Sequence, residues 1–525
     1  MKNIPAAHSG TRELRGARGR RISAAAAWAT TPAGRLALLI ATSFLARLLF
    51  AASLGLGIDE SYMVAAGRKL QLSYFDHPPV AWWMAWAATH LAGSQSPLIV
   101  RLPFISAFAL TTLLMYRVTS SLFTPTAGLA AAAVLNIAPV FGMSSASWVL
   151  PDGPLFAALL GGVACLIPAL GPMRGTAWGW WAGAGACAGL ALCSKYSAVL
   201  TLIGLVAFLL TEPTSRRWLA RPQPYVAGLI ALAIFSPVLL WNAEHGWVSL
   251  LFQGGRAEGA FRPFGPIVTF AGEAVFLLPW IWAPLIACGF FALRRGPADR
   301  DRWLLVCLAA PPVVVFAVVS FWSKVLFHWA APGYLMLIPL LGDATARHWQ
   351  GSRPVRLWLA ASALFVALAT ALYASDVRFN WLPASIADVA RGNLRDVDVV
   401  DWTLMRQDLA DRGLLDRPNL IVAAMRWTDA GKIDYALEGR IPVICLGPDA
   451  RQYGVTTNRD DYAGYDVLIA TRLPFEKIVG QYWFLFDRID PLPPVPVSGS
   501  ARAALRLNLF LGHGLHKAAD ECCAS

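Results

Sequence analysis

The chain has 525 residues, of which 57% are hydrophobic and only 14% charged, and its mean hydropathy is +0.52. These values exclude an ordinary soluble enzyme and indicate a protein with many membrane spans. The net charge of +12 does not indicate nucleic-acid binding, because the basic residues lie in short loops and form no continuous basic face.

Apolar runs long enough to cross a bilayer predict about eleven transmembrane helices between residues 34 and 375. They lie near residues 34–57, 98–119, 125–143, 153–170, 177–193, 197–211, 224–242, 267–293, 303–321, 328–342 and 354–375. Residues 1–33 form a basic tail without the apolar core of a signal peptide, and we interpret this tail as cytoplasmic. With the tail inside, every loop that follows an even-numbered span is basic, so the positive-inside rule is satisfied throughout.

The first long loop, residues 58–97, lies on the outer face in this topology. Residues 61–71 have helix-like spacing, and a second amphipathic stretch follows Pro78 and Pro79. Both stretches are predicted to be short helices that lie in the membrane interface.

This loop also concentrates acidic residues. Asp59, Glu60 and Asp76 are three of only eight carboxylates between Gly34 and Leu293. Because a carboxylate beside a membrane is costly to desolvate, such a cluster indicates a functional site.

The composition changes after Asp376, where 19 carboxylates and 17 Lys or Arg residues give the density of a soluble domain. Short apolar runs predict three strands, at residues 420–424, 441–446 and 466–470. The segment between the first two, residues 428–438, is predicted to be a helix that ends at Gly439. We therefore predict a small periplasmic α/β domain over residues 376–525, which the proline-rich segment Pro491–Pro496 is expected to end.

Ionisable side chains from five separate segments reach the outer face together in this topology. They are Asp59, Glu60, Asp76, His77, Arg101, Asp152, Lys195, Lys324 and His328. Such a set suits sugar transfer from a lipid-linked phosphate, since cations stabilise the leaving phosphate and a carboxylate takes the proton of the acceptor hydroxyl. Asp59 or Asp76 is the candidate base, and the basic residues are candidate phosphate ligands.

Several of these residues also have a structural interpretation. Helix capping competes for Glu60 and Asp152, and snorkelling to the interface competes for Arg101 and Lys324. Lys195 is the strongest candidate, because a basic residue in a very short outer turn runs against the usual charge bias.

At this point the motifs resemble those of the polyprenyl-phosphate-dependent glycosyltransferases of family 39, which include protein O-mannosyltransferases and lipid A aminoarabinose transferases. The series comprises D-E-x-Y from Asp59, Y-F-D-H-P-P-V-x-x-W from Tyr74 to Trp83, R-L-P at Arg101, S-W-V-L-P-D-G-P-L-F around Asp152, G-L-A-L-C-S-K-Y around Lys195 and K-V-L-F-H-W-A-A-P-G-Y from Lys324 to Tyr334. The ordered series covers most of the membrane part and is more specific than any single piece.

The resemblance implies a GT-C fold and an inverting transfer from an undecaprenyl- or dolichyl-type phosphate sugar in the inner membrane. The acceptor would be lipid A or lipopolysaccharide, another envelope lipid or glycan, or a protein. Asp59 would be the base, Asp76 a second active-site carboxylate and Lys195 a ligand of the donor phosphate. Asp76 and His77 stand where the aminoarabinose enzymes have Glu-Lys, so the sugar and the acceptor stay undetermined.

Other candidates and alternatives complete the prediction. Trp82, Trp83 and Trp329 lie near the motifs and are candidate sugar-binding residues, and Tyr74 is a further candidate substrate-binding residue. No Cys/His spacing predicts a metal site and no redox cofactor is expected, whereas the use of a divalent metal stays open. The main alternative function is a transporter or flippase of a lipid-linked sugar. Transporters place ionisable residues near the midplane and often contain internal repeats, whereas the predicted topology of this chain gathers the charged groups at one face and its sequence has no evident repeat.

Overall fold

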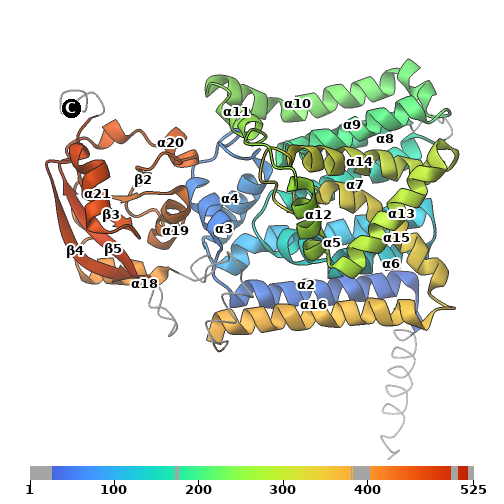
Figure 1. Cartoon of the computed structure of the whole chain (residues 1–525), viewed down its shortest axis with the longest axis horizontal. Helices are drawn as coiled ribbons and strands as arrows, with labels where there is room; N and C mark the ends of the chain where they lie inside the picture. Colours follow the sequence, from blue (N-terminus) through green and yellow to red (C-terminus); the bar gives the residue numbers. More distant parts are fainter. Residues whose placement is uncertain (1–26, 172–176, 380, 382–401, 498–505, 518–525) are drawn as a thin grey trace, which may run out of the picture.

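The computed structural model describes residues 27–171, 177–379, 381, 402–497 and 506–517. It consists of a body of long, roughly parallel helices with a sheet-containing unit at one end of that body (Figure 1). The greater part of the predicted cytoplasmic tail, residues 1–26, lies outside the described residues.

The helices of the body follow one another with short connections. They are α2 (Pro32–Ser53), α3 (Ile58–Ala66), α4 (Val80–Ala92), α5 (Pro97–Leu122), α6 (Pro125–Ile137), the π-helix Val140–Ser145, α7 (Asp152–Ala169), α8 (Ala177–Ser194), α9 (Ala198–Thr211), α10 (Pro222–Glu244), α11 (Val248–Gly255), α12 (Gly265–Leu277), α13 (Pro279–Arg295), α14 (Arg300–Val319), α15 (Ala331–His348) and α16 (Arg353–Phe379). Each of the eleven apolar runs coincides with one of these helices or with the pair α12 and α13.

In the described part of the chain, six helices are long and apolar enough to cross a membrane: α2, α5, α7, α10, α14 and α16. The pair α12 and α13 makes a seventh if it counts as one span, although it bends by 112°. The bend lies at Leu278, which has a φ of +69° and precedes Pro279. The remaining predicted spans fall on α6, α8, α9 and α15, which are shorter or less apolar, so six or seven helices of the described residues meet the length and hydropathy of a span and the number eleven stays a prediction.

Local sequence explains where several helices begin. Thr31 and Thr124 accept hydrogen bonds from backbone N–H groups at the starts of α2 and α6, and a proline follows each threonine. Threonine at the cap and proline at the first helical position are both preferred at such starts.

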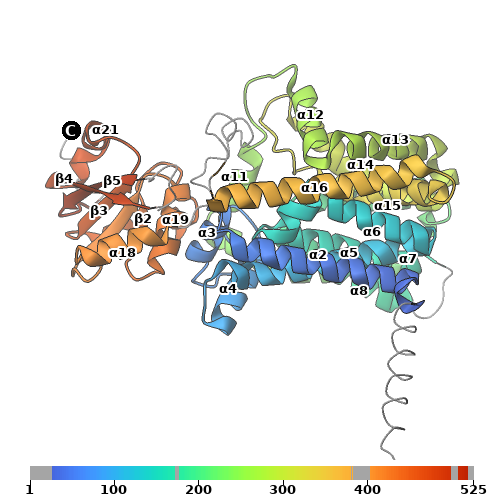
Figure 2. The same cartoon turned by 90° about the horizontal axis from the view of Figure 1, so that it is seen from below.

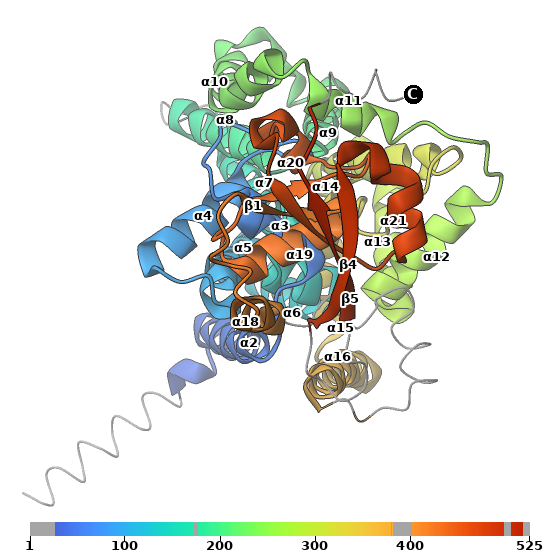
Figure 3. The same ribbon diagram turned by 90° about the vertical axis from the view of Figure 1, so that its left-hand side faces the viewer.

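The sheet unit, which faces the viewer in Figure 3, has five strands in the order β2-β1-β3-β5-β4. Its elements are β1 (Leu420–Ala424), β2 (Val443–Cys445), β3 (Asp466–Thr471), β4 (Arg488–Pro496), β5 (Arg506–His513), α18 (Thr403–Asp411), α19 (Trp427–Leu437), α20 (Gln452–Thr456) and α21 (Phe475–Tyr482). β1 pairs in parallel with β2 and β3, whereas β5 runs antiparallel to β3 and β4. The three runs predicted as strands thus coincide with β1, β2 and β3.

The expectation for Pro491–Pro496 is wrong. These residues do not end the unit but lie in β4, which pairs with β5 at one edge of the sheet. An edge strand tolerates proline, because one side of the strand needs no backbone N–H donors.

The loop of residues 58–97 and the sheet unit share one hydrophobic core. Tyr62 of α3 and Trp82 of α4 are fully buried in the same cluster as Ile433 and Leu437 of α19. α3 and α4 accordingly lie at the end of the helix body that faces the sheet unit (Figures 1 and 2). The packing therefore joins the loop of residues 58–97 to the C-terminal unit across the predicted boundary at 376.

Candidate functional site

A cavity of about 650 Å³ lies where the helix body meets the sheet unit. Seven predicted ionisable residues line it: Asp59, Glu60, Asp76, His77, Asp152, Lys195 and His328. Residues absent from the prediction also line it, among them Gln253, Arg256, Trp427, Thr428 and Arg451. The structure therefore brings most of the predicted ionisable groups to one place.

Lys195 and Asp152 form a buried ion pair in the wall of this cavity. The Lys195 Nζ atom lies 2.9 and 3.0 Å from the two carboxylate oxygens of Asp152. Asp152 is the first residue of α7, where the helix dipole also favours a carboxylate, and Lys195 lies in the turn between α8 and α9. The turn thus holds a cation at the end of two apolar helices.

Asp76 is buried and has a partner at each carboxylate oxygen. Its Oδ1 lies 3.3 Å from the Tyr62 hydroxyl, and its Oδ2 accepts a hydrogen bond from Arg451 at 3.0 Å. Gln253 donates to the Asp76 backbone carbonyl at 2.6 Å. Burial raises the pKa of Asp76, while the guanidinium of Arg451 opposes this shift.

His77 is a neutral imidazole at physiological pH. Burial, with a smaller contribution from Lys195, lowers its pKa to about 3. Its Nδ1 atom is buried and forms no hydrogen bond within the described residues. His77 therefore offers the cavity a neutral polar atom and not a charge.

Arg256 follows α11 and contributes a further cation. Its guanidinium lies 4.6 Å from the ring centre of Trp329 and 5.3 Å from that of Phe252. Within the described part of the chain, no carboxylate forms an ion pair with it. The sequence contained one signal for Arg256, because the predicted topology places it in an outer segment, where it runs against the same charge bias that singled out Lys195.

Glu60 lines the cavity, but its carboxylate is occupied by structural contacts. It accepts hydrogen bonds from the backbone N–H groups of Gly57 at 2.7 Å and Val149 at 3.1 Å, and from Arg101 at 2.5 and 2.8 Å. Burial alone would raise the pKa of Glu60, but Arg101 and these N–H donors hold it below its usual value. The capping interpretation therefore describes Glu60 better than direct catalysis.

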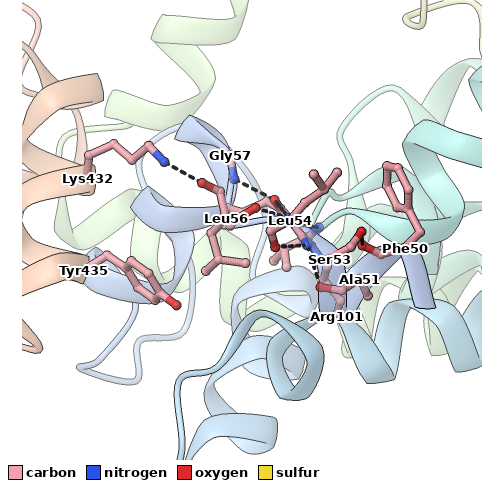
Figure 4. A network of polar contacts seen from close by, with 12 residues as sticks. Phe50, Ala51, Ser53, Leu54, Leu56, Gly57, Arg101, Lys432 and Tyr435 are labelled. Atoms are coloured by element: carbon pink, nitrogen blue, oxygen red, sulfur yellow. Dashed lines mark hydrogen bonds and ion pairs between the residues drawn. The ribbon is translucent and has the colours of Figure 1, made fainter. Parts of the chain in front are cut away.

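Arg101 does not reach the cavity, contrary to its prediction as a phosphate ligand. Besides Glu60, it donates to the carbonyl oxygens of Ala51, Leu54 and Gly55 at the end of α2 (Figure 4). Its side chain is only 1% exposed, so every N–H group serves the fold.

Four more predicted substrate-binding residues lie outside the cavity lining. Tyr74 is buried and stacks on Trp82 with ring centres 4.2 Å apart, whereas Trp83 donates to the Gln71 carbonyl at 2.8 Å. Lys324 is exposed in the connection between α14 and α15. The three aromatic residues stabilise the loop of residues 58–97, which explains their place in the motif.

Trp427, Thr428 and Arg451 come from the sheet unit and had no signal in the sequence. They lie in loops or at a helix start, more than 300 residues from Asp76 in the chain, and belong to no recognised motif. Among the described residues, no three His, Cys, Asp or Glu side chains form a group able to hold a metal ion.

Comparisons with known proteins agree with this geometry. The family described as dolichyl-phosphate-mannose-protein mannosyltransferase matches residues 76–241, a stretch that contains Asp76, His77, Asp152 and Lys195. The lipid A galacturonosyltransferase RgtD of Rhizobium johnstonii is 24% identical over 296 residues, which are 53% of this chain and 58% of that relative. The match therefore spans less than two thirds of the relative.

Solved structures with the same fold include ArnT from Cupriavidus metallidurans in the apo state and bound to undecaprenyl phosphate. The alignments cover 91% of this chain and 98% of ArnT, with TM-scores of 0.62 and 0.60 at 15% and 16% identity. The ArnT-like GT-C fold and the resemblance to polyprenyl-phosphate-dependent glycosyltransferases are thus confirmed.

Proposed function

We propose that this chain is a membrane glycosyltransferase that transfers a sugar from a polyprenyl phosphate to an envelope acceptor. The observation that carries the proposal is the cavity itself, in which four carboxylates meet the cations Lys195, Arg256 and Arg451. We also propose the finer topology, with about eleven spans, a cytoplasmic N-terminus and residues 376–525 on the periplasmic side of the inner membrane.

The reaction assigns a separate task to each charge. The acceptor hydroxyl oxygen attacks the anomeric carbon, the bond from that carbon to the phosphate oxygen breaks, and polyprenyl phosphate leaves with inversion. Asp59 takes the proton of the hydroxyl, because it lies exposed in the first turn of α3 and lines the cavity. Asp76, which is already bonded to Tyr62 and Arg451, orients the reactants as the second carboxylate.

The phosphate lies between Lys195 and Arg256 in this proposal. Arg256 presents a guanidinium without an ion-pair partner in the described chain, and Lys195 shares its charge between Asp152 and the phosphate. Cations placed at developing negative charge stabilise the transition state most strongly in a site that excludes water. Neutral His77, together with His328, supplies further polar contacts in the same wall.

The acceptor is proposed as a class. A relative named as a lipid A galacturonosyltransferase and an ArnT structure with undecaprenyl phosphate favour lipid A or lipopolysaccharide, with another envelope lipid, a glycan or a protein as alternatives. A lipid-linked sugar flippase is the rival function, but the ion pair in the cavity wall lies at helix ends, with Asp152 at the first residue of α7 and Lys195 in the turn after α8.

Purified protein in detergent, added to envelopes isolated from cells that lack the gene, tests the proposal. We expect release of undecaprenyl phosphate together with a sugar-sized mass gain on one envelope component. Lys195→Met should abolish both signals, whereas Lys324→Met, which changes an exposed lysine outside the cavity, should retain them. Movement of the donor lipid without release of undecaprenyl phosphate would favour the flippase.

A further inference from the structure

Arg451 has a backbone conformation that a residue with a side chain rarely adopts. Its φ is +47° and its ψ is −127°, a combination that glycine tolerates far better. The residue lies directly before α20 in the sheet unit, and its side chain lines the cavity. Strained residues of this kind cluster at functional sites, so an arginine kept at this position needs an explanation.

Two contacts of Arg451 point to the candidate active site, whereas a third, an ion pair of 3.5 Å with exposed Asp449, stays within the sheet unit. Its guanidinium lies 3.7 Å from the ring centre of Trp427 and donates to Asp76 Oδ2 at 3.0 Å. The stacked tryptophan fixes the plane of the guanidinium, and the hydrogen bond fixes one oxygen of the carboxylate.

The next residue supports the same carboxylate by a second route. Gln452 is fully buried, its backbone N–H donates to the Tyr62 hydroxyl at 3.0 Å, and its Oε1 accepts from the Phe75 N–H at 2.8 Å. Tyr62 in turn faces Asp76 Oδ1. Two consecutive residues of the sheet unit therefore hold both oxygens of Asp76, one directly and one through Tyr62.

We propose that Arg451 is a positioning residue for Asp76, so that the C-terminal unit completes the active site and does not merely cover it. This inference rests on the proposed glycosyltransferase function. Asp76 needs both its orientation and its charge to act on the reactants, and Arg451 supplies the only ion pair that it forms within the described residues.

The polar and charged groups around Asp76 determine how activity should depend on pH if Arg451 has this role. Tyr62 faces it from α3, Gln253 from α11, Arg256 from the segment after α11, His77 from the next position and Arg451 from the sheet unit. Burial raises the pKa of Asp76, and Arg451 limits that rise. Removal of Arg451 should raise the pKa of Asp76 further. Activity that needs the ionised carboxylate should then already be lost at a higher pH as the solution is made more acidic.

The decisive variant is Arg451→Gly, because glycine relieves the backbone strain while it removes the guanidinium. Glu438→Gly is the matched control, since Glu438 also has a positive φ, of +55°, in the sheet unit but lies outside the cavity. Glu438→Gly should keep or raise the thermal midpoint of the purified protein. Arg451→Gly should lower it, because buried Asp76 loses its ion-pair partner whatever the role of that pair, so the rate, the pH profile and chemical rescue distinguish a positioning role from a structural one.

The transfer assay with isolated envelopes then measures the effect of Arg451 on the reaction rate and on its pH dependence. We expect Arg451→Gly to slow transfer about 100-fold, as misplacement of a reacting group does, to shift the acid limb of the pH profile upward and to regain activity with added methylguanidinium. Its affinity for undecaprenyl phosphate in detergent should stay at the wild-type value, and Glu438→Gly should transfer normally.

Each of three results would overturn the inference: a wild-type transfer rate in Arg451→Gly, a loss of its affinity for undecaprenyl phosphate, or a failure of methylguanidinium to restore its activity. Absence of transfer by the wild-type protein would overturn the proposed function together with it. The two failures are therefore distinguishable.

Discussion

Replacement of Arg101 should destabilise the folded protein without changing its affinity for undecaprenyl phosphate. Arg101 and Glu60 form a buried ion pair whose side chains are 1% and 4% exposed. Arg101 also donates to three carbonyl oxygens at the end of α2 (Figure 4). Glu60 accepts hydrogen bonds from two backbone N–H groups. The pair thus joins the end of α2 to α3 and α5.

The expected loss follows from the charge left behind. Removal of one partner of a buried ion pair costs about 3–5 kcal/mol, because the other charge stays desolvated and unpaired. Arg101→Met also leaves carbonyl oxygens without donors, which places the variant at the upper end of that range. The double variant Glu60→Leu/Arg101→Met should be less destabilised than the two single losses together, by about 0.5–3 kcal/mol of coupling.

Equilibrium unfolding in mixed detergent micelles, followed by tryptophan fluorescence, measures these differences for the wild type, both single variants and the double variant. Undecaprenyl phosphate affinity of the folded protein should be unchanged in Arg101→Met. If Arg101→Met instead has wild-type stability and has lost undecaprenyl phosphate affinity, Arg101 is a phosphate ligand and the structural reasoning is refuted.

The remaining predictions concern Lys195, His77 and Gly431. Lys195→Met should lower the rate of undecaprenyl phosphate release on the order of 10²–10³-fold, as loss of a preorganised charge does; a rate within a factor of two of the wild type would contradict its role. Folded His77 has a pKa of about 3 and binds fewer protons than the unfolded chain, so its contribution to stability should fall as pH decreases from about 6.5 towards 3. Unfolding measured across that window should show a smaller pH dependence in His77→Gln, and an identical slope would refute the assignment. Gly431→Ala should loosen the sheet unit, because an added Cβ meets backbone and side-chain atoms of Tyr62 at 2.8 Å, whereas Gly480→Ala meets nothing within 4 Å. Hydrogen exchange at α3 should rise only in the first variant, and equal exchange in both would count against this packing.

The sequence was sufficient for the features that follow from local patterns. Apolar runs located the helices, the acidic cluster indicated residues that line the cavity, and charge bias singled out Lys195. These signals depend on a few neighbouring residues and on the cost of placing charge beside lipid, so they can be recognised from the sequence alone.

Long-range pairing was beyond the sequence. Nothing local indicates that Arg101 would pair with Glu60, or that Arg451 would cross from the sheet unit to Asp76. Arg256 had the same charge signal as Lys195 but no motif around it. Pro491–Pro496 was misread because proline ends interior strands, whereas the edge position of β4 is a property of the whole sheet.

The most direct test of the proposed function is mass spectrometry of envelope lipids and glycans from cells that lack the gene. The same cells should be complemented with the wild type or with Asp59→Asn at equal membrane levels. The proposal predicts a sugar-sized mass on one envelope component with the wild type only. Identical glycoforms in all three strains would contradict it and would favour transport or a non-enzymatic role.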